Sequence, residues 1–146
     1  MIVTSQSSPT KKSLYTLSCR PLWLRTTGMC TLSPFDAETD FTVNMAGAGS
    51  SVNLISRSVA KERSRQIFRS RIVGNASCQG HSECDAIIMD EASVSAIPEL
   101  TANNINANLI HEAAIGKIAG EQLIKLMTLG LTEKEAEEQI VKGFLK

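Results

Sequence analysis

The sequence predicts a mainly β chain that ends in two α-helices, and two patterns carry that prediction. Between residues 40 and 110, short runs of alternating apolar and polar residues are separated by Gly, Asn and Pro, which is typical of strands and turns. From His111 onward the apolar residues recur at helical spacing instead, and this change of period marks the passage from strand to helix. We therefore predict an atypical or poorly ordered leader over 1–38, a β core over 39–110 and a helical region over 111–146.

The composition narrows the class of protein. The chain has 146 residues with a net charge of zero, and 42% are apolar and 21% charged, as in an ordinary globular domain. Aromatic residues make up only 4%, which argues against a platform for stacking nucleic-acid bases. No apolar run approaches the roughly 18 residues of a spanning helix. Four cysteines with no preceding signal sequence predict reduced thiols. We therefore expect a cytoplasmic protein that binds neither nucleic acid nor membrane.

The first 35 residues differ from the rest of the chain. They contain no acidic residue and are rich in Ser and Thr, as in a transit peptide. They also lack a sustained period of 2 or 3.6, and only residues 13–19 resemble a strand. We interpret them as a disordered or spurious leader in preference to a transit peptide.

The β core contains short strands at irregular spacing. Phe41, Val43 and Met45 alternate with polar residues before the glycine-rich break at 47–50. Over residues 63–73, four arginines occupy one parity while Phe68 and Ile72 share the other, which predicts one solvated and one buried face. The sequence contains no two-residue Asn-Gly turn of the kind that joins neighbouring strands in a β-meander. This pattern suits a parallel solenoid whose coils stack on their neighbours, but on its own it does not favour that fold over a β-sandwich.

The C-terminal residues predict two helices joined by a tight turn. One apolar stripe runs through Ile115, Ala119, Leu123 and Met127. Gly130 stands where a glycine commonly ends a helix. The next helix begins with the capping box Thr132-Glu-Lys-Glu. Because its first two turns carry four acidic residues, we exclude a DNA-recognition helix.

Several motifs, taken in order, resemble the SufB/SufD family of iron–sulfur cluster assembly scaffolds. They are SECDAIIMD, IHEAAIGKI, EQLIKLMTLGLTEKEA and the closing IVKGFLK, all within residues 80–146. The earlier runs TDFTVNMAGAGSSVNLISRSVAKERS and RSRIVGNASCQGHS are similar to coils of the same family. The resemblance covers residues 39–146 and leaves residues 1–35 unmatched.

This resemblance implies a right-handed parallel β-helix over 39–110, followed by an α-helical hairpin. It also implies a non-catalytic scaffold that supports formation and transfer of a transient iron–sulfur cluster. The expected partners are a SufC-type ABC ATPase on the helices, a second SufB/SufD-type subunit and a cysteine desulfurase or other sulfur donor. Since relatives in this family are longer, the alternative is a truncated remnant that keeps partner docking and binds no cluster. We expect no enzyme, because the sequence shows no paired catalytic acids, nucleophile motif or phosphate loop.

Cys84 is the first candidate ligand. It matches the family cysteine implicated in cluster assembly, and a thiolate is the ligand that iron–sulfur chemistry requires. On a strand, Glu83 and Asp85 would face away from it, so the two acids need not suppress its ionisation. Without the family, the simpler interpretation is a buried cysteine that packs as a small apolar residue.

His111 and Glu112 match a His-Glu pair implicated in assembly, and both are competent iron ligands. Their alternatives are a hydrogen-bonding histidine at a junction and an acid favoured in the first turn of a helix. Cys84 and Glu112 are 28 residues apart, which is about one coil of a solenoid. We therefore expect Cys84, His111 and Glu112 to lie on adjacent strands and to converge as iron ligands of the nascent cluster.

Cys78 and His81 are secondary candidates. Together with Cys84 they suggest a metal site, but their spacing does not fit structural zinc, which needs a fourth ligand. We keep them as auxiliary cluster ligands at most. Cys19 and Cys30 lie in the leader and receive no role.

Overall fold

In a computed structural model, the structure describes residues 3–4, 11–19, 23–33 and 36–145, with side chains described for residues 36–145. Nine strands precede two helices in this part of the chain. The strands are β1 (Val3–Thr4), β2 (Lys11–Cys19), β3 (Trp23–Ser33), β4 (Ala37–Met45), β5 (Ser50–Ala60), β6 (Arg65–Gly74), β7 (Cys78–Ile88), β8 (Ser93–Ala102) and β9 (Ala107–Gly116); the helices are α1 (Gly120–Thr128) and α2 (Glu133–Phe144).

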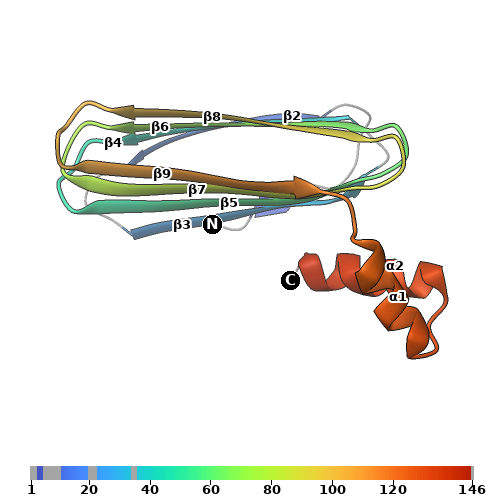
Figure 1. The fold of residues 1–146 in the computed structure, drawn as a ribbon. Coiled ribbons are helices and arrows are strands. Elements are labelled where there is room, and N and C mark those ends of the chain that lie inside the picture. Colours follow the sequence, from blue (N-terminus) through green and yellow to red (C-terminus); the bar gives the residue numbers. More distant parts are fainter. Residues whose placement is uncertain (1–2, 5–10, 20–22, 34–35, 146) are drawn as a thin grey trace.

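Successive strands alternate between two stacked parallel sheets (Figure 1). The odd-numbered strands form a five-stranded sheet in the order β1-β3-β5-β7-β9, and the even-numbered strands form a four-stranded sheet in the order β2-β4-β6-β8. Every strand from β3 onward pairs in parallel with the strand two places before it. The mainly β prediction with two C-terminal helices is therefore confirmed, and the parallel pairing agrees with stacked coils rather than with an antiparallel sandwich.

The spacing between paired strands is nearly constant, although no repeat is visible in the sequence. Asn53 of β5 and His81 of β7 are hydrogen-bonded and 28 residues apart, and Ser50 pairs with Cys78 at the same spacing. Cys78 in turn pairs with Ala107, so the offset from β7 to β9 is one residue longer. Because strand side chains alternate with a period of 2, an even offset keeps parity from one coil to the next and an odd offset reverses it.

The core lies between the two sheets. Phe41, Val43 and Met45 of β4 point inward and are at most 7% exposed, as their alternation predicted. Phe68 of β6 meets Phe41 with ring centroids 5.9 Å apart at 54°. Burial of each large apolar side chain contributes about 1.5–3 kcal/mol. The inward-facing residues therefore hold the two sheets together.

The outer face of the four-stranded sheet carries two of the predicted arginines, and they are paired. Arg69 of β6 forms ion pairs with Glu38 and Asp40 of β4. On the other side, Arg71 lies 2.5 Å from Glu99 of β8. These cross-strand pairs follow from the register and support the interpretation of a solvated face rather than a nucleic-acid surface.

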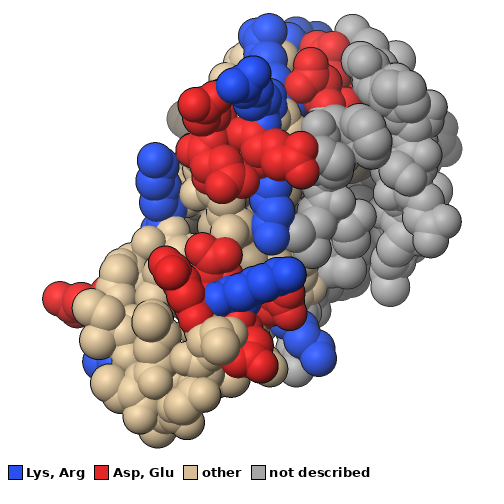
Figure 2. Space-filling view, turned by 90° about the vertical axis from the view of Figure 1, so that its right-hand side faces the viewer, with Lys and Arg blue, Asp and Glu red and all other residues tan. Residues whose placement is uncertain are grey.

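The corners that join the two sheets also repeat. Glu62 and Asp90 are 28 residues apart, and each adopts a positive φ, 60° and 55°. The Glu62 amide donates to the Asp90 carboxylate at 2.8 Å, and Arg63 pairs with Glu91 at 3.0 Å. Figure 2 faces this end of the sheets and shows acidic and basic side chains gathered together.

Three described strands of the predicted leader, β1, β2 and β3, lie in the sheets. Strand β2 pairs with β4 along its whole length, and β3 pairs with β5. These segments therefore continue the same alternation of strands, contrary to a leader that lacks regular structure. The predicted boundary at residue 38 also differs from the start of β4 at Ala37. Residues 1–2, 5–10, 20–22 and 34–35 of the predicted leader lie outside the described part of the chain.

The expectation that the helical region begins at His111 is wrong. Residues 107–116 form β9, which pairs with β7 from Ala107 to Gly116. The residues after His111 can extend a strand because Ala113 and Ile115 alternate in phase with Cys84 and Ala86 of β7. Pairing with β7 therefore prevails over the helical spacing of the apolar residues, and α1 begins only at Gly120.

The two helices and their turn are confirmed. They contact each other and lie beyond the end of β9 (Figure 1). Gly130 has a φ of +94°, which suits a glycine after a helix end. The Thr132 side chain accepts from the Glu135 amide at 3.3 Å, while the Glu135 carboxylate accepts from the Thr132 amide at 2.8 Å, which completes the capping box. Among the described residues, no helix is both long enough and apolar enough to span a membrane.

Candidate functional site

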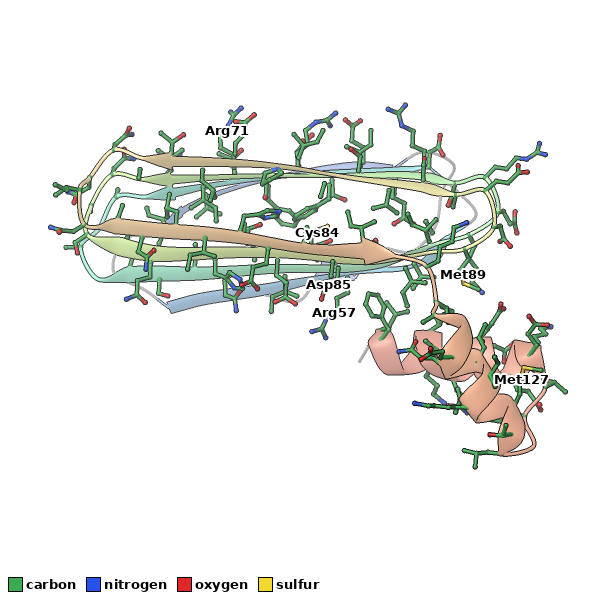
Figure 3. All side chains as sticks on the ribbon, in the orientation of Figure 1. Arg57, Arg71, Cys84, Asp85, Met89 and Met127 are labelled. Carbon is green, nitrogen blue, oxygen red and sulfur yellow. The ribbon has the colours of Figure 1, made fainter. Side chains whose placement is uncertain are left out.

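The candidate residues lie on two adjacent strands of the five-stranded sheet, β7 and β9, and divide between its two faces. In β7 the even-numbered residues 78–86 point into the space between the sheets, and the odd-numbered residues point out. Figure 3 shows Cys84 between the sheets and Asp85 with Arg57 on the outer side. The sheet therefore separates an inner group around Cys84 from an outer group around Glu112.

Cys84 is the most enclosed of the candidates. It is 1% exposed and belongs to the same core cluster as Leu54 and Phe68. Burial raises the pKa of its thiol to about 11, with a smaller contribution from the negative charge of Asp85. The expectation that Asp85, facing the opposite way, would leave the thiol unaffected is therefore corrected. In this conformation, Cys84 is a protonated thiol at neutral pH and a poor nucleophile.

His111 shares the inner face with Cys84. It is the register partner of Ser82, while Cys84 is the partner of Ala113, so the two side chains are diagonal neighbours on β7 and β9. The Nδ1 atom of His111 is buried and has no hydrogen-bond partner within the described residues. A buried polar atom without a partner is uncommon. The Nδ1 atom of His111 is therefore free of hydrogen bonds to the described residues and could bind a ligand.

Glu112 lies on the outer face and has a different partner. Its Oε2 atom is 3.5 Å from Nε2 of His81, and its side chain is 69% exposed. The other ring nitrogen of His81, Nδ1, lies 3.2 Å from Oδ1 of Asn53 on β5. A series of polar contacts thus crosses three adjacent strands of this sheet, from Asn53 through His81 to Glu112. A histidine held through one nitrogen presents the other in a fixed direction.

More charged groups flank this chain on the outer face. Glu83 is the direct register partner of Glu112. A hydrogen bond with Asp85, followed by burial and the Asp85 charge, raises the pKa of Glu83. Arg57 of β5 lies 3.9 Å from Glu83 and 3.7 Å from Asp85. The outer face therefore presents several carboxylates around one arginine and one histidine.

We predicted that Cys84, His111 and Glu112 lie on adjacent strands and converge. The strands are adjacent, but the Glu112 side chain is on the opposite face from the other two. β7 and β9 are neighbours, as the spacing predicted. However, Cys84 pairs with Ala113 rather than with Glu112, so the offset between β7 and β9 is one residue longer than the prediction requires. This single residue reverses parity, so that Cys84 and His111 point inward while Glu112 points outward. The structure brings two of the three predicted ligands to one face.

The secondary candidates also separate. Cys78 is buried at the start of β7, three inward positions before Cys84, and successive residues of a strand rise about 3.3 Å. His81 lies on the outer face with Glu112. Within the described residues, no group of three or more His, Cys, Asp or Glu side chains is arranged to hold a metal ion. The two cysteines and the histidine of β7 therefore do not form one site in this conformation.

The sequence analysis missed the contacts that Asn53 and His81 make. Asn53 and His81 are 28 residues apart, as are several ion-paired residues on successive coils. A search for polar residues 28 positions apart would have identified them, because residues at this spacing lie opposite each other on adjacent strands.

The chain was compared with known proteins once this geometry was established. Residues 32–144 match the family model described as SUF system FeS cluster assembly, SufBD core domain. The match covers β4 to β9 and both helices, and therefore includes every candidate ligand.

Curated relatives support the same assignment. An iron–sulfur cluster assembly SufBD family protein of Methanothermobacter thermautotrophicus is 40% identical over 105 residues, which cover 70% of this chain and 26% of the relative. A SufBD family protein of Archaeoglobus fulgidus is 42% identical over 104 residues, covering 70% and 28%. The iron–sulfur cluster assembly protein SufB of Bacillus subtilis is 37% identical over 100 residues, covering 66% and 22%. The chain spans about a quarter of the length of these relatives.

Proposed function

Because this chain belongs to the SufBD family of the SUF iron–sulfur cluster assembly system, we propose that it acts as a scaffold component that supports formation and transfer of a nascent cluster. The observation that carries the proposal is the juxtaposition of Cys84 and His111 on one face of β7 and β9. A cysteine, once deprotonated to the thiolate, and a neutral imidazole are both ligands that iron accepts in proteins. On this proposal the cluster is cargo, and the chain catalyses no turnover.

The fold proposed for this scaffold is a right-handed parallel β-helix. Each pair of strands, such as β6 and β7, makes one coil that crosses from one sheet to the other and returns to the first sheet one rung further along the stack. Connections between parallel strands are right-handed in almost all proteins. A stack of coils provides a rigid support in which successive rungs hold donors at a fixed spacing of about 4.8 Å.

Cys84 can reach a cluster only if its surroundings open. It is 1% exposed and its thiol has a pKa of about 11, so neither iron nor a sulfur donor meets a thiolate in the closed state. β9 is the edge strand that covers β7 on one side. We therefore infer that β9 separates from β7 when iron is loaded. That movement also changes the position of His111 and Glu112, which are on the strand that moves.

Glu112 and His81 extend the proposed ligand set on the outer face. Their contact atoms are 3.5 Å apart, a separation that two ligands of one ion can have when each bond is about 2.1 Å. Between the two auxiliary candidates, this geometry favours His81 over Cys78. Cys78 remains packed against Gly74, where a built Cβ atom would lie 3.1 Å from its sulfur.

The partners proposed for the chain match its uncovered surfaces. Ile124, Met127 and Leu129 of the helical region are 62%, 44% and 79% exposed, and we propose that a SufC-type ATPase covers them. β8 and β9 are edge strands with free backbone groups, and we propose that a second SufB/SufD-type subunit pairs there. We propose that a cysteine desulfurase or related donor supplies the sulfur.

Anaerobic reconstitution with ferrous iron and sulfide tests the proposal. All variants are made in a background that carries Cys19→Ser and Cys30→Ser, so that Cys78 and Cys84 of β7 are the thiols under test. We expect Cys84→Ser to lose more than half of the bound iron and of the visible absorption of the cluster. Cys78→Ser is the matched control, because it removes another buried inward-facing thiol from the same strand, and it should load normally. Undiminished loading of Cys84→Ser would end the proposal for Cys84.

The alternative is a remnant that retains partner docking without binding a cluster. On this alternative, the enclosed Cys84 thiol serves only as a residue of the core. Capture of a SufC-type ATPase by the full chain is expected under both functions. Capture without any cluster, in the presence or absence of a second scaffold subunit, would support the remnant.

A further inference from the structure

A small, partly open cavity is lined in part by Cys84. Its polar wall includes Ser56 and Ser58 of β5, Gln66 of β6 and Cys84 of β7. The rest of the wall is formed by Thr39 and by the apolar residues Ala37, Ile67, Phe68 and Val94. It leaves about 20 Å³ for the centre of a water-sized molecule. One water requires roughly 10–15 Å³ by this measure. The cavity is therefore large enough for one water and too small for an organic ligand.

One residue that lines the cavity, Gln66, has a buried oxygen without a hydrogen-bond donor among the described residues. Gln66 is 5% exposed, and its Nε2 atom donates to the Val59 carbonyl at 3.3 Å. Its Oε1 atom is buried and accepts no hydrogen bond from any described residue. An amide oxygen in such a place normally accepts at least one hydrogen bond.

Other polar groups surround the same space. The hydroxyls of Ser56 and Ser58 can each donate one hydrogen bond and accept others. Buried water typically makes two to four hydrogen bonds, and cavities lined only by apolar groups stay dry. The serine hydroxyls and the Gln66 amide give this cavity enough polar groups for one water, while apolar side chains form the rest of its wall.

We propose that this cavity binds one internal water molecule, which donates to Oε1 of Gln66 and bonds to the serine hydroxyls next to Cys84. The water links β5 and β6 across the interior and gives the thiol a polar neighbour in an enclosed site. This inference does not depend on cluster binding, because it follows from the cavity and the unpaired oxygen alone.

A crystal structure of the full chain, at a resolution that shows ordered solvent clearly, gives the first test. We expect a single solvent peak within hydrogen-bond distance of Gln66 Oε1. An empty cavity, or a Gln66 side chain turned so that a protein group donates to Oε1, would overturn the proposal.

Oxygen-17 relaxation dispersion gives the second test, because it counts water molecules that stay bound for longer than nanoseconds. Gln66→Leu should have one long-lived water fewer than the unaltered chain. Ser50→Ala is the control, since Ser50 is also buried but donates to the Gly47 carbonyl, away from this cavity. Equal counts in all three proteins contradict the proposal. If Gln66→Leu does not fold, Ser58→Val is used instead, and it should lose the same water because its larger side chain fills the space.

Discussion

The middle strands and the last strands of the two sheets carry the same pattern of inward-facing residues but differ in what covers them. Ile72 of β6 is fully buried, whereas its register partner on β8, Leu100, is 38% exposed. In the five-stranded sheet, Ala86 of β7 is 3% exposed and its partner Ile115 of β9 is 39% exposed. In both sheets, a strand is thus buried by the next strand of the sheet. Position in the stack, rather than residue type, decides how much a side chain stabilises the fold.

The pair Ile72 and Leu100 gives the largest test of this difference. We expect Ile72→Ala to lower the free energy of unfolding by about 2–5 kcal/mol, because it leaves a cavity in the enclosed core. Leu100→Ala should lower it by roughly 1 kcal/mol or less, since that side chain is already partly in water. Urea denaturation followed by circular dichroism measures both. Equal losses would show that the last coil is covered in solution.

A glycine between coils provides the next test. A Cβ atom at Gly74 would lie 2.8 Å from the Cβ of Ala107 on β9 and 3.1 Å from the Cys78 sulfur. Gly74→Ala should therefore destabilise the chain by about 1–3 kcal/mol through overpacking. Gly116→Ala, at the open end of β9 with no atom within 4 Å, is the control. If both variants have the same unfolding midpoint, the coils do not approach as closely as described.

Substitutions in the helices beyond β9 should lower the stability less than those in the core, and their effect should stay within the helices. Thr132→Ala removes the cap of α2 and should cost about 1 kcal/mol. Amide hydrogen exchange should increase in α2 and remain unchanged in β6. Thr128→Ala, which removes a hydroxyl that donates to the Lys125 carbonyl outside the cap, is the control. Faster exchange in the strands would mean that the helices and the coils unfold together.

The capping box of α2 also predicts that the stability of this helix depends on pH. Hydrogen bonds from the Thr132 amide and hydroxyl lower the pKa of Glu135 below its usual value. A carboxyl with a lowered pKa in the folded state stabilises the fold above its ordinary pKa, about 4.3, and loses that contribution as the pH falls further. Protection of α2 amides should therefore decline below that pH. In Glu135→Gln this part of the decline should be absent.

The smallest effect is expected at an exposed corner. Arg63 and Glu91 form an ion pair whose side chains are 87% and 74% exposed. Exposed pairs contribute little and are screened by salt. Arg63→Gln should leave the unfolding midpoint close to that of the unaltered chain at both low and high salt. A large shift would mean that the corner is covered by another part of the protein.

Local patterns predicted the strands and helices well where neighbours in sequence decide the structure. The alternation of Phe41, Val43 and Met45 and the capping box at Thr132 involve residues only a few positions apart. The error at β9 has another origin. Residues 111–116 satisfy helical spacing, but pairing with β7 is a contact with residues of the preceding coil, far away in the sequence. Only the register of the completed sheet could decide between the two.

The candidate site shows the same limit. The spacing of Cys84 and Glu112 correctly placed them on adjacent strands. Whether they share a face depends on whether the coil contains an even or an odd number of residues, and the sequence has no visible repeat from which to count. One additional residue in the connection to β9 moves Glu112 to the outer face, where it meets His81.

The most direct test of the closed inner face is the rate at which a small alkylating reagent modifies Cys84 in the native chain, measured by mass spectrometry at pH 7.4. The rise of the Cys84 pKa from 9.0 to about 11 alone lowers the thiolate fraction by about 100-fold, and burial lowers access further. We predict modification at least that much slower than in the urea-unfolded chain. Modification of the native chain at the unfolded rate would contradict a Cys84 enclosed beneath the last coil.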